Sequence, residues 1–501
     1  MPRNREPLKT SRRQLINYGA RGALGLGLAA SGVPLFAGQA EAVRAAPVAA
    51  PSLVGPAGAN IPADPAQRTL VVLQLSGGND GLNTVIPYTD PLYTGVGGTS
   101  LRPNVRIPTA NVLPINSTLG LHPNLRPLMN YWGSGDLAVI EGVEYPAPDY
   151  SHFRSTEIWM TGDDRRVGGL GWLGHALDHL SYHPALVAVS LGVTIPQALV
   201  GMQPTDIAIG GSLRDFTYKP VGSIDPGAVT AMYDYMKTNA AHTNGVYKKL
   251  VMDSHDVAQD AMGGIARLAA AGYTPAVAYP NSGLANGLKT VAQMIHGNVG
   301  SRVLYLSTGG YDTHSNQRGA HDNLMNTFAQ GVDAFWRDMT AQGHADNIVL
   351  MTFSEFGRRP AENASSGTDH GSAGVMFVMG PSISGGLYGA APNLTGLPGG
   401  NLVVQQDFRQ VYAALLQNWL GISAPDILPY GPYAPMPLFA PMPDAAPPTS
   451  RPVAPPVGGV PGDTLPTRAA ATQAAPPPVG AGTPTPRAAN TPLPAPVRRV
   501  G

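Results

Sequence analysis

The sequence predicts an α/β protein built on a doubly wound, mostly parallel sheet with helices on both faces. Short, almost wholly apolar runs alternate along the chain with longer segments of helical spacing, and polar clusters lie beside several of these runs. Strands this apolar suit a sheet that is covered on both faces, which is the usual setting of parallel strands. The apolar runs span residues 70–75, 137–140, 185–189, 302–306, 348–352 and 375–379.

Helical spacing is found in three segments between and after these runs, at 284–297, 323–342 and 408–420. In the last of them the apolar positions recur every three or four residues, which indicates a helix with one buried face. These positions are Phe408, Val411, Tyr412, Leu415, Leu416 and Trp419. Doubly wound sheets bind ligands at the carboxyl ends of their strands, so we expect the functional site where polar residues follow the predicted strands.

The composition excludes several classes of protein. The 501 residues contain 32 Lys and Arg against 32 Asp and Glu, so no basic surface for nucleic acid is expected. There is no cysteine, which rules out disulfides, thiolate metal sites and cysteine nucleophiles. The 61 glycines and 50 prolines predict many loops. The sequence does not identify a protein partner.

The N-terminus predicts export. Residues 11–16, with Arg12 and Arg13, resemble a twin-arginine signal, and a weakly apolar stretch follows at 19–30. The small-x-small pattern of residues 40–42 suits cleavage, so we assign 1–42 as a signal peptide and expect a periplasmic or extracellular protein. The apolar stretch is too short for a membrane span, and none is expected after cleavage.

The rest of the chain divides by composition into a body with flanking segments. Residues 43–67 are predicted to form a linker, 68–424 the folded domain and 425–439 a connecting segment. The Pro- and Ala-rich tail at 440–501 has too few large apolar side chains to offset the entropy of ordering, and we predict that it is disordered.

Carboxylates and imidazoles lie near the ends of the predicted strands. The candidates for metal ligands are Asp80, Asp312, His314, Glu355 and His370. A mixed set of oxygen and nitrogen donors suits a divalent ion such as Zn, Mn or Fe better than Ca or Mg, and the number of ions stays open. Each residue taken alone could equally be a helix cap, a turn residue or a hydrogen-bonded histidine, and the setting of Asp80 is the most turn-like.

A second polar cluster precedes a predicted helix. Ser151 and His152 stand at its start, where the positive end of the helix dipole favours an anion such as phosphate. A serine that simply caps the helix is the alternative. Arg154, Arg358 and Arg359 could each bind an anion or form a structural ion pair, and the sequence does not distinguish these roles.

In this order, segments 75–83, 310–314, 353–358 and 368–371 resemble the DUF1501 family, exported proteins related to the alkaline phosphatase/sulfatase superfamily. The resemblance spans about 69–421 and implies an alkaline phosphatase-like fold. It places Asp80 at a metal-binding aspartate and Ser151 at the nucleophile. Counting back from Trp159 and from Thr161-Gly162 instead places His152 there, so the nucleophile stays open between Ser151 and His152.

The resemblance also shows departures. Phe356 stands where the superfamily has a metal-binding histidine, and a phenyl ring cannot bind a metal. The five candidates are enough for one well-held ion, and two complete sites would need more. The pattern that precedes sulfatase maturation is absent around Ser151.

The sequence therefore predicts an exported, metal-dependent hydrolase of phosphate, sulfate or related esters, acting on a small molecule or a glycan. One alternative is a catalytically degenerate relative that binds glycan, wall material or a partner. The other is an envelope-assembly protein that acts through its Pro-rich tail.

Overall fold

The computed structural model describes residues 61–439, with gaps at 63, 181–183, 193, 204–205, 210–212, 214–230, 232–233, 236–237 and 239–245. The predicted signal peptide, most of the predicted linker and the predicted tail lie outside the described residues. The described residues all belong to one compact unit. None of the helices described is long and apolar enough to cross a membrane.

A nine-stranded sheet forms the centre of the described residues, in the order β13-β5-β12-β9-β1-β8-β6-β7, with β14 paired to β5. β1 lies between β8 and β9 and is parallel to both, whereas β12 is antiparallel to both of its neighbours. The strands are β1 (Thr69–Leu75), β5 (Leu137–Glu144), β6 (Ala188–Leu191), β7 (Asp206–Ala208), β8 (Val303–Thr308), β9 (Ile348–Phe353), β12 (Gly374–Met379), β13 (Gly386–Tyr388) and β14 (Gln406–Asp407).

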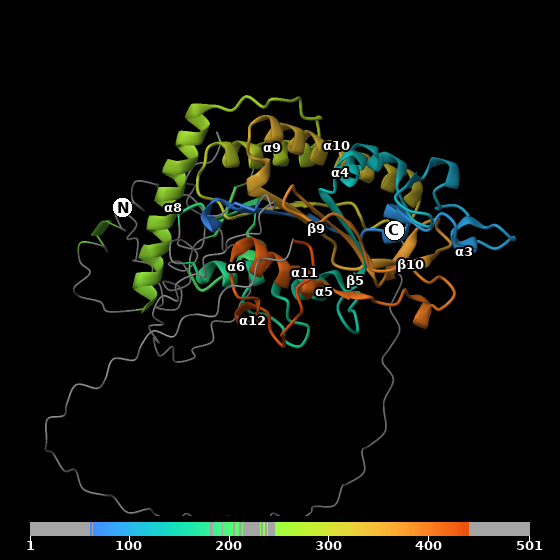
Figure 1. Ribbon diagram of the computed structural model, residues 1–501. Helices are drawn as coiled ribbons and strands as arrows, with labels where there is room; N and C mark the ends of the chain where they lie inside the picture. The colour runs from blue at the N-terminus through green and yellow to red at the C-terminus, as the bar shows by residue number, and fades with distance from the viewer. Residues whose placement is uncertain are drawn as a thin grey trace, which may run out of the picture. The chain divides into compact units, whose positions relative to one another are not determined.

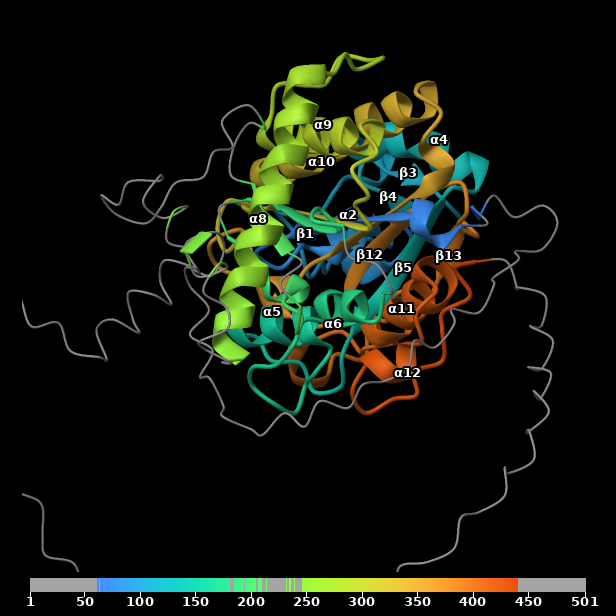
Figure 2. The same ribbon diagram turned by 90° about the vertical axis from the view of Figure 1, so that its left-hand side faces the viewer.

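Helices cover both faces of this sheet, as Figures 1 and 2 show. One face carries α4 (Met129–Ser134), α8 (Val246–Ala271), α9 (Gly283–His296) and α10 (Gln317–Ala341). The other carries α5 (His152–Thr161), α6 (Trp172–Asp178), α11 (Phe408–Ala414) and α12 (Ala424–Ile427). This arrangement confirms the predicted doubly wound, mostly parallel α/β fold.

Each face has its own hydrophobic core, and β1 shows why an apolar run was needed. Val71, Leu73 and Leu75 are buried in the core that includes α9 and α10, whereas Leu70 and Val72 are buried in the core that includes α5 and α11. Successive side chains of a strand point to opposite faces, so a strand covered on both sides must be apolar at every position.

Two smaller sheets and two short helices lie outside the central sheet. β10 (Gly357–Glu362) and β11 (Thr368–Gly371) form an antiparallel pair. A three-stranded sheet contains β2 (Val85–Ile86), β3 (Leu113–Pro114) and β4 (Gly120–Leu121). Two short helices, α2 (Gly81–Thr84) and α3 (Pro91–Thr94), follow β1.

The boundaries differ from the sequence analysis in several places. The run 185–189 becomes a strand only from Ala188, and α10 begins at Gln317, six residues before the expected start. The helix expected at 408–420 changes at Leu415–Leu420 into a π-helical segment. The segment 425–439 also belongs to the core, because Leu428, Leu438 and Phe439 are buried in it.

Two buried arginines hold the end of this π-helical segment. Arg68 Nη1 donates to the Trp419 carbonyl at 3.0 Å, and Arg302 Nη2 donates to the Leu420 carbonyl at 3.2 Å. The last carbonyls of a helix lack partners within the helix and carry partial negative charge, so cations stabilise them. Burial lowers the pKa of Arg302 to about 10, and it stays charged at neutral pH.

A buried carboxyl in β5 gives the fold a testable pH dependence. Glu141 is buried, and its Oε1 has no hydrogen-bond partner within the described part of the chain. Burial raises the pKa of Glu141 well above its ordinary value of 4.5. At a pH above this ordinary value, the glutamate of the unfolded chain loses a proton that the folded protein keeps. The free energy of unfolding therefore falls as the pH rises.

We expect Glu141→Gln to remove this part of the pH dependence. The variant should gain stability relative to the wild type as the pH rises above about 4.5, by up to about 1.4 kcal/mol per pH unit, and show no such gain at lower pH. Urea unfolding at pH 4, 6 and 8 measures the difference, with the exposed Asp426→Asn as control. Curves of identical pH dependence for wild type and Glu141→Gln would contradict the assignment.

Candidate functional site

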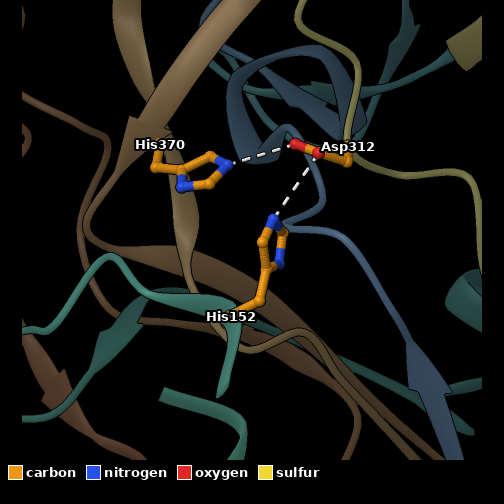
Figure 3. Close-up of side chains that lie close together, drawn as sticks. All are labelled: His152, Asp312 and His370. Atoms are coloured by element: carbon orange, nitrogen blue, oxygen red, sulfur yellow. Dashed lines mark hydrogen bonds and ion pairs between the residues drawn. The ribbon is translucent and has the colours of Figure 1, made fainter. Parts of the chain in front are cut away.

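The candidate site lies at the carboxyl edge of the sheet, where several loops meet. Asp312 and His314 lie in the loop after β8, His370 lies on β11, and His152 is the first residue of α5. We call these four residues the His–Asp cluster. Ligand atoms of His152, Asp312 and His370 lie within 4.8 Å of one another, and Figure 3 shows both imidazoles pointing toward the carboxylate.

Asp312 is the centre of the cluster. Its Oδ1 lies 3.1 Å from His370 Nε2 and 3.0 Å from His314 Nε2, and its Oδ2 lies 3.5 Å from His152 Nε2. The two Nε2 atoms of His314 and His370 are themselves only 2.9 Å apart. Three imidazoles and one carboxylate therefore direct ligand atoms toward one another.

The opposite ring nitrogen of each histidine is fixed by an acceptor outside the cluster. Nδ1 lies 2.8 Å from Glu355 Oε1 in His152, 3.3 Å from Asp369 Oδ1 in His314 and 2.8 Å from the Tyr150 carbonyl in His370. Ionised carboxylates and carbonyls only accept hydrogen bonds, so each Nδ1 carries the proton and donates it. A neutral ring then has its lone pair on Nε2, inside the cluster.

This tautomer assignment determines what the cluster can bind. Two lone pairs at 2.9 Å, beside a carboxylate oxygen, repel each other unless a positive ion or an extra proton lies among them. Histidine ligands of metals are held in the same way, with Nδ1–H donating to a carboxylate or carbonyl and Nε2 facing the ion. The arrangement thus has the inner donors and the outer supports of a metal site.

The spacing and the protonation states also fit a metal ion. Donors about 2.1 Å from a tetrahedral ion are separated by roughly 3.4 Å. The separations of Asp312 from the three histidines, 3.0 to 3.5 Å, are close to this value. Burial raises the pKa of Asp312, but Arg358, which donates a hydrogen bond to this carboxylate and carries a positive charge, outweighs it and lowers that pKa to about 2. Burial lowers the pKa of His370, which favours the neutral ring that a metal requires.

Arg358 resolves a question that the sequence left open. Its side chain is buried, and its Nη2 donates to Asp312 Oδ1 at 2.6 Å, so it pairs with Asp312 and not with Glu355. The same guanidinium donates to the carbonyls of Gly78 and Thr368, each at 2.7 Å. It therefore joins the loop after β1, the loop after β8 and β11 around the cluster.

Glu355 and Asp80 have other contacts. Glu355 is buried, and its Oε1 accepts from the Gly77 N–H at 2.8 Å as well as from His152. Asp80 is fully buried and receives Arg102 Nη1 at 2.9 and 2.6 Å. Burial raises the pKa of Asp80, but the charge of Arg102 outweighs it, so Asp80 stays ionised within this pair. The structure does not bring Asp80 into the His–Asp cluster, and the roles of Asp80 and Glu355 as ligands stay predictions.

Ser151 and Phe356 lie beside the cluster in the chain. Ser151 is exposed and occupies the N-cap of α5, yet its hydroxyl makes no capping hydrogen bond. The ring of Phe356 lies 4.9 Å from that of His152 and 4.3 Å from that of His370. Phe356 thus packs an apolar ring against two imidazoles. Arg154, which the sequence offered as an anion ligand, instead forms an ion pair with Glu157 at 2.8 Å.

The cluster is open to solvent. The exposed fractions of its side chains are 36% for His152, 45% for Asp312, 44% for His314 and 21% for His370. A structural metal site is usually closed by its protein ligands, whereas a catalytic site keeps a position for water or substrate. This exposure favours a site that meets external ligands.

Sequence reasoning missed the residues that support the cluster. Asp369, next to His370, holds His314, and its signal was its place in the Thr-Asp-His-Gly motif. Buried Gln317 gave no such signal. Its Oε1 accepts from Thr313 Oγ1 at 3.1 Å and from Thr368 Oγ1 at 2.6 Å, while its Nε2 donates to Asp80. It ties the loop of Asp312 and His314 to β11.

We expect Gln317→Leu to weaken divalent-ion binding by roughly 10- to 100-fold, because the loop of Asp312 and the strand β11 lose the acceptor that they share. Zinc affinity in competition with a chelator measures the effect. The control is Gln293→Leu in α9, where the amide donates only to the distant Leu268 carbonyl. Unchanged zinc affinity in a folded Gln317→Leu protein would show that Gln317 does not position the cluster.

Comparisons with known proteins bear on the family. No curated protein sequence matches the chain. Solved structures resemble it weakly, each with a TM-score well below 0.5. Ps i-CgsB with k-i-k-neocarrahexaose has a TM-score of 0.32 at 10% identity, covering 71% of this chain and 72% of that one. The PsFucS1 sulfatase from Pseudoalteromonas sp. has a TM-score of 0.29 at 12% identity, covering 71% and 68%. The phosphonate monoester hydrolase of Agrobacterium radiobacter has a TM-score of 0.26 at 10% identity, covering 74% and 79%.

Likeness at this level does not define a function. The family comparison is more direct, because it covers a continuous segment that contains Asp312, His314, Glu355 and His370. Residues 240–417 match the family described as protein of unknown function (DUF1501), which confirms the resemblance to that family over this part of the chain.

Proposed function

We propose that the protein is an exported, metal-dependent hydrolase of phosphate, sulfate or related esters. The observation that carries the proposal is the convergence of Nε2 lone pairs and the Asp312 carboxylate in the His–Asp cluster. In particular, His314 and His370 bring their Nε2 atoms to 2.9 Å with both Nδ1 atoms already donating elsewhere. Export rests on the Arg12-Arg13 motif of the sequence.

His152, Asp312 and His370, whose ligand atoms lie within 4.8 Å of one another, would hold the ion, and His314 lies beside Asp312 and His370. Imidazole nitrogens with a carboxylate oxygen suit Zn, Mn or Fe. A bound divalent ion supplies Lewis-acid stabilisation to the negative charge that develops on an ester during hydrolysis.

The protein's own groups divide the remaining work. Ser151 is exposed, and its hydroxyl makes no capping bond. It stands between Tyr150, whose carbonyl holds His370, and His152, a member of the cluster. We assign Ser151 as the nucleophile. It stands at the N-terminus of the ten-residue helix α5, where the dipole favours the negative charge of an ester. Glu355 orients His152, and Arg358 keeps Asp312 ionised and in place.

A second candidate is a degenerate member that binds a ligand without turnover. The observation in its favour is that arginines already pair with two of the predicted ligands, Arg102 with Asp80 and Arg358 with Asp312. These pairs reduce the negative charge left for cations at the sheet edge. Metal content and turnover, measured together, separate the two candidates.

We expect His370→Ala to lose both bound metal and ester hydrolysis, because the ring is an inner donor. Ser151→Ala should keep the metal and lose turnover by about 100-fold or more. Elemental analysis of protein purified without added metal gives the first readout, and a panel of phosphate and sulfate esters gives the second. The control is the exposed Ser117→Ala, which should match the wild type in both.

The possible outcomes distinguish the hydrolase from the binding protein. Metal that is lost in His370→Ala, with no hydrolysis of any ester by the wild type, would favour the binding protein. A folded wild type that takes up no divalent ion would overturn the metal-dependent hydrolase.

A further inference from the structure

We propose that His296 and His344 bind a divalent transition-metal ion at the amino edge of the central sheet. The two side chains bring ring nitrogens to 3.2 Å, with Nδ1 of His296 against Nε2 of His344. We call these two residues the amino-edge pair. The pair is separate from the His–Asp cluster at the carboxyl edge, and the inference does not rest on the proposed function.

Two parallel helices place the amino-edge pair. α9 ends at His296 and leads into β8, while α10 ends at Ala341 and leads through His344 into β9. Because β8 and β9 are both parallel to β1, the two helices run in the same direction and end at the same edge of the sheet. They also pack side by side on one face of the sheet, as Figures 1 and 2 show. The fold therefore brings together two histidines that lie 48 positions apart.

The charge at this edge favours a cation. The last carbonyls of a helix carry partial negative charge, and here the carboxyl ends of a 14-residue helix and a 25-residue helix lie together. The backbone N–H of His344 donates to the Met339 carbonyl at 2.8 Å, which holds His344 against the end of α10. A buried carboxylate lies close by, since Tyr273 donates to Asp338 Oδ2 at 2.6 Å and its ring lies 5.5 Å from that of His296.

The geometry of the two rings suits shared coordination. Two donors about 2.1 Å from a tetrahedral ion are separated by roughly 3.4 Å, close to the 3.2 Å of the amino-edge pair. Within the described residues, the other ring nitrogen of each histidine has no hydrogen-bond partner, so it can carry the ring proton and donate it to water. Both facing nitrogens then present lone pairs to the same point. Without an ion, one facing nitrogen must carry a proton and donate it to the other, and the ion replaces this proton.

A cavity beside His344 leaves room for the remaining ligands. Its volume is about 330 Å³, and the side chains that line it include Gln67, Asn298 and Asn347. Two protein donors leave a tetrahedral ion with two positions for water or a small external ligand. Imidazole donors select ions such as Zn, Ni or Cu over Ca and Mg, which prefer oxygen. The bound ion would fasten the end of α9 to the turn before β9.

The test measures zinc bound per chain by the full-length protein in equilibrium dialysis against Zn²⁺. His296→Ala and His344→Ala should each lose about one zinc ion per chain, and the double variant should lose no more than either single variant, because both histidines hold the same ion. The rise in thermal midpoint that zinc produces should shrink in the same variants. His296 is exposed, so its replacement leaves the core intact.

The matched control is His179→Ala, which removes another exposed histidine of a ring pair. Its ring lies 5.4 Å from that of His175, and no hydrogen bond joins the two rings within the described part of the chain. This variant should bind as much zinc as the wild type. His370→Ala separates the two metal sites, because adding His296→Ala to it should again remove about one zinc ion, whether or not the His–Asp cluster binds metal or the protein hydrolyses esters.

Wild-type zinc content in folded His296→Ala and His344→Ala overturns the inference. An equal loss of zinc in His179→Ala overturns it as well, because zinc would then bind to any exposed histidine. A double variant that loses twice as much zinc as each single variant would show that the two histidines do not share an ion.

Discussion

The candidate site depends on the hydrogen bonds of one buried guanidinium, that of Arg358. It reaches carbonyls of the loop after β1, the carbonyl of Thr368 on β11 and the carboxylate of Asp312 after β8. These segments are distant in the sequence and meet only because their strands share one edge of the sheet. A guanidinium can satisfy several fixed acceptors at once, whereas a lysine ammonium could not match this geometry. The buried positive charge is compensated by the one carboxylate that faces it, so Asp312 is held in place by the same contact that joins the loops.

The acceptors that orient the histidine rings of the His–Asp cluster also bring its Nε2 lone pairs together. Three separate acceptors hold the Nδ1 protons, and each bond turns an Nε2 lone pair inward. Lone pairs that converge without a positive charge between them repel one another, so the stability of this arrangement is coupled to the binding of a cation or a proton. This coupling explains why the outer contacts are extensive. Without them the rings would rotate and relieve the repulsion.

Much of the fold could be predicted from the sequence, because strands covered on two sides leave an unmistakable apolar run. β1, β8, β9 and β12 follow this rule, and α9 follows from helical spacing. Asp312, His314 and His370 could be identified since polar residues beside buried strands gather at one edge. His152 could be placed at the start of α5, but its contact with Glu355 spans 203 positions and has no local signal.

Asp80 shows that a local sequence pattern does not reveal the partner of a buried charge. Its residue type and place after β1 suit a metal ligand, and the Gly-Asn-Asp-Gly setting suits a turn, yet neither feature reveals Arg102. The pair forms because the segment after α3 returns to the sheet edge, where Arg102 also donates to the carbonyls of Arg359 and Pro360. A buried carboxylate needs compensation, and an arginine held by backbone carbonyls provides it permanently. The edge of this sheet thus carries one carboxylate, Asp80, that is fully enclosed with its arginine, and one, Asp312, that pairs with Arg358 and remains open to the histidines of the cluster.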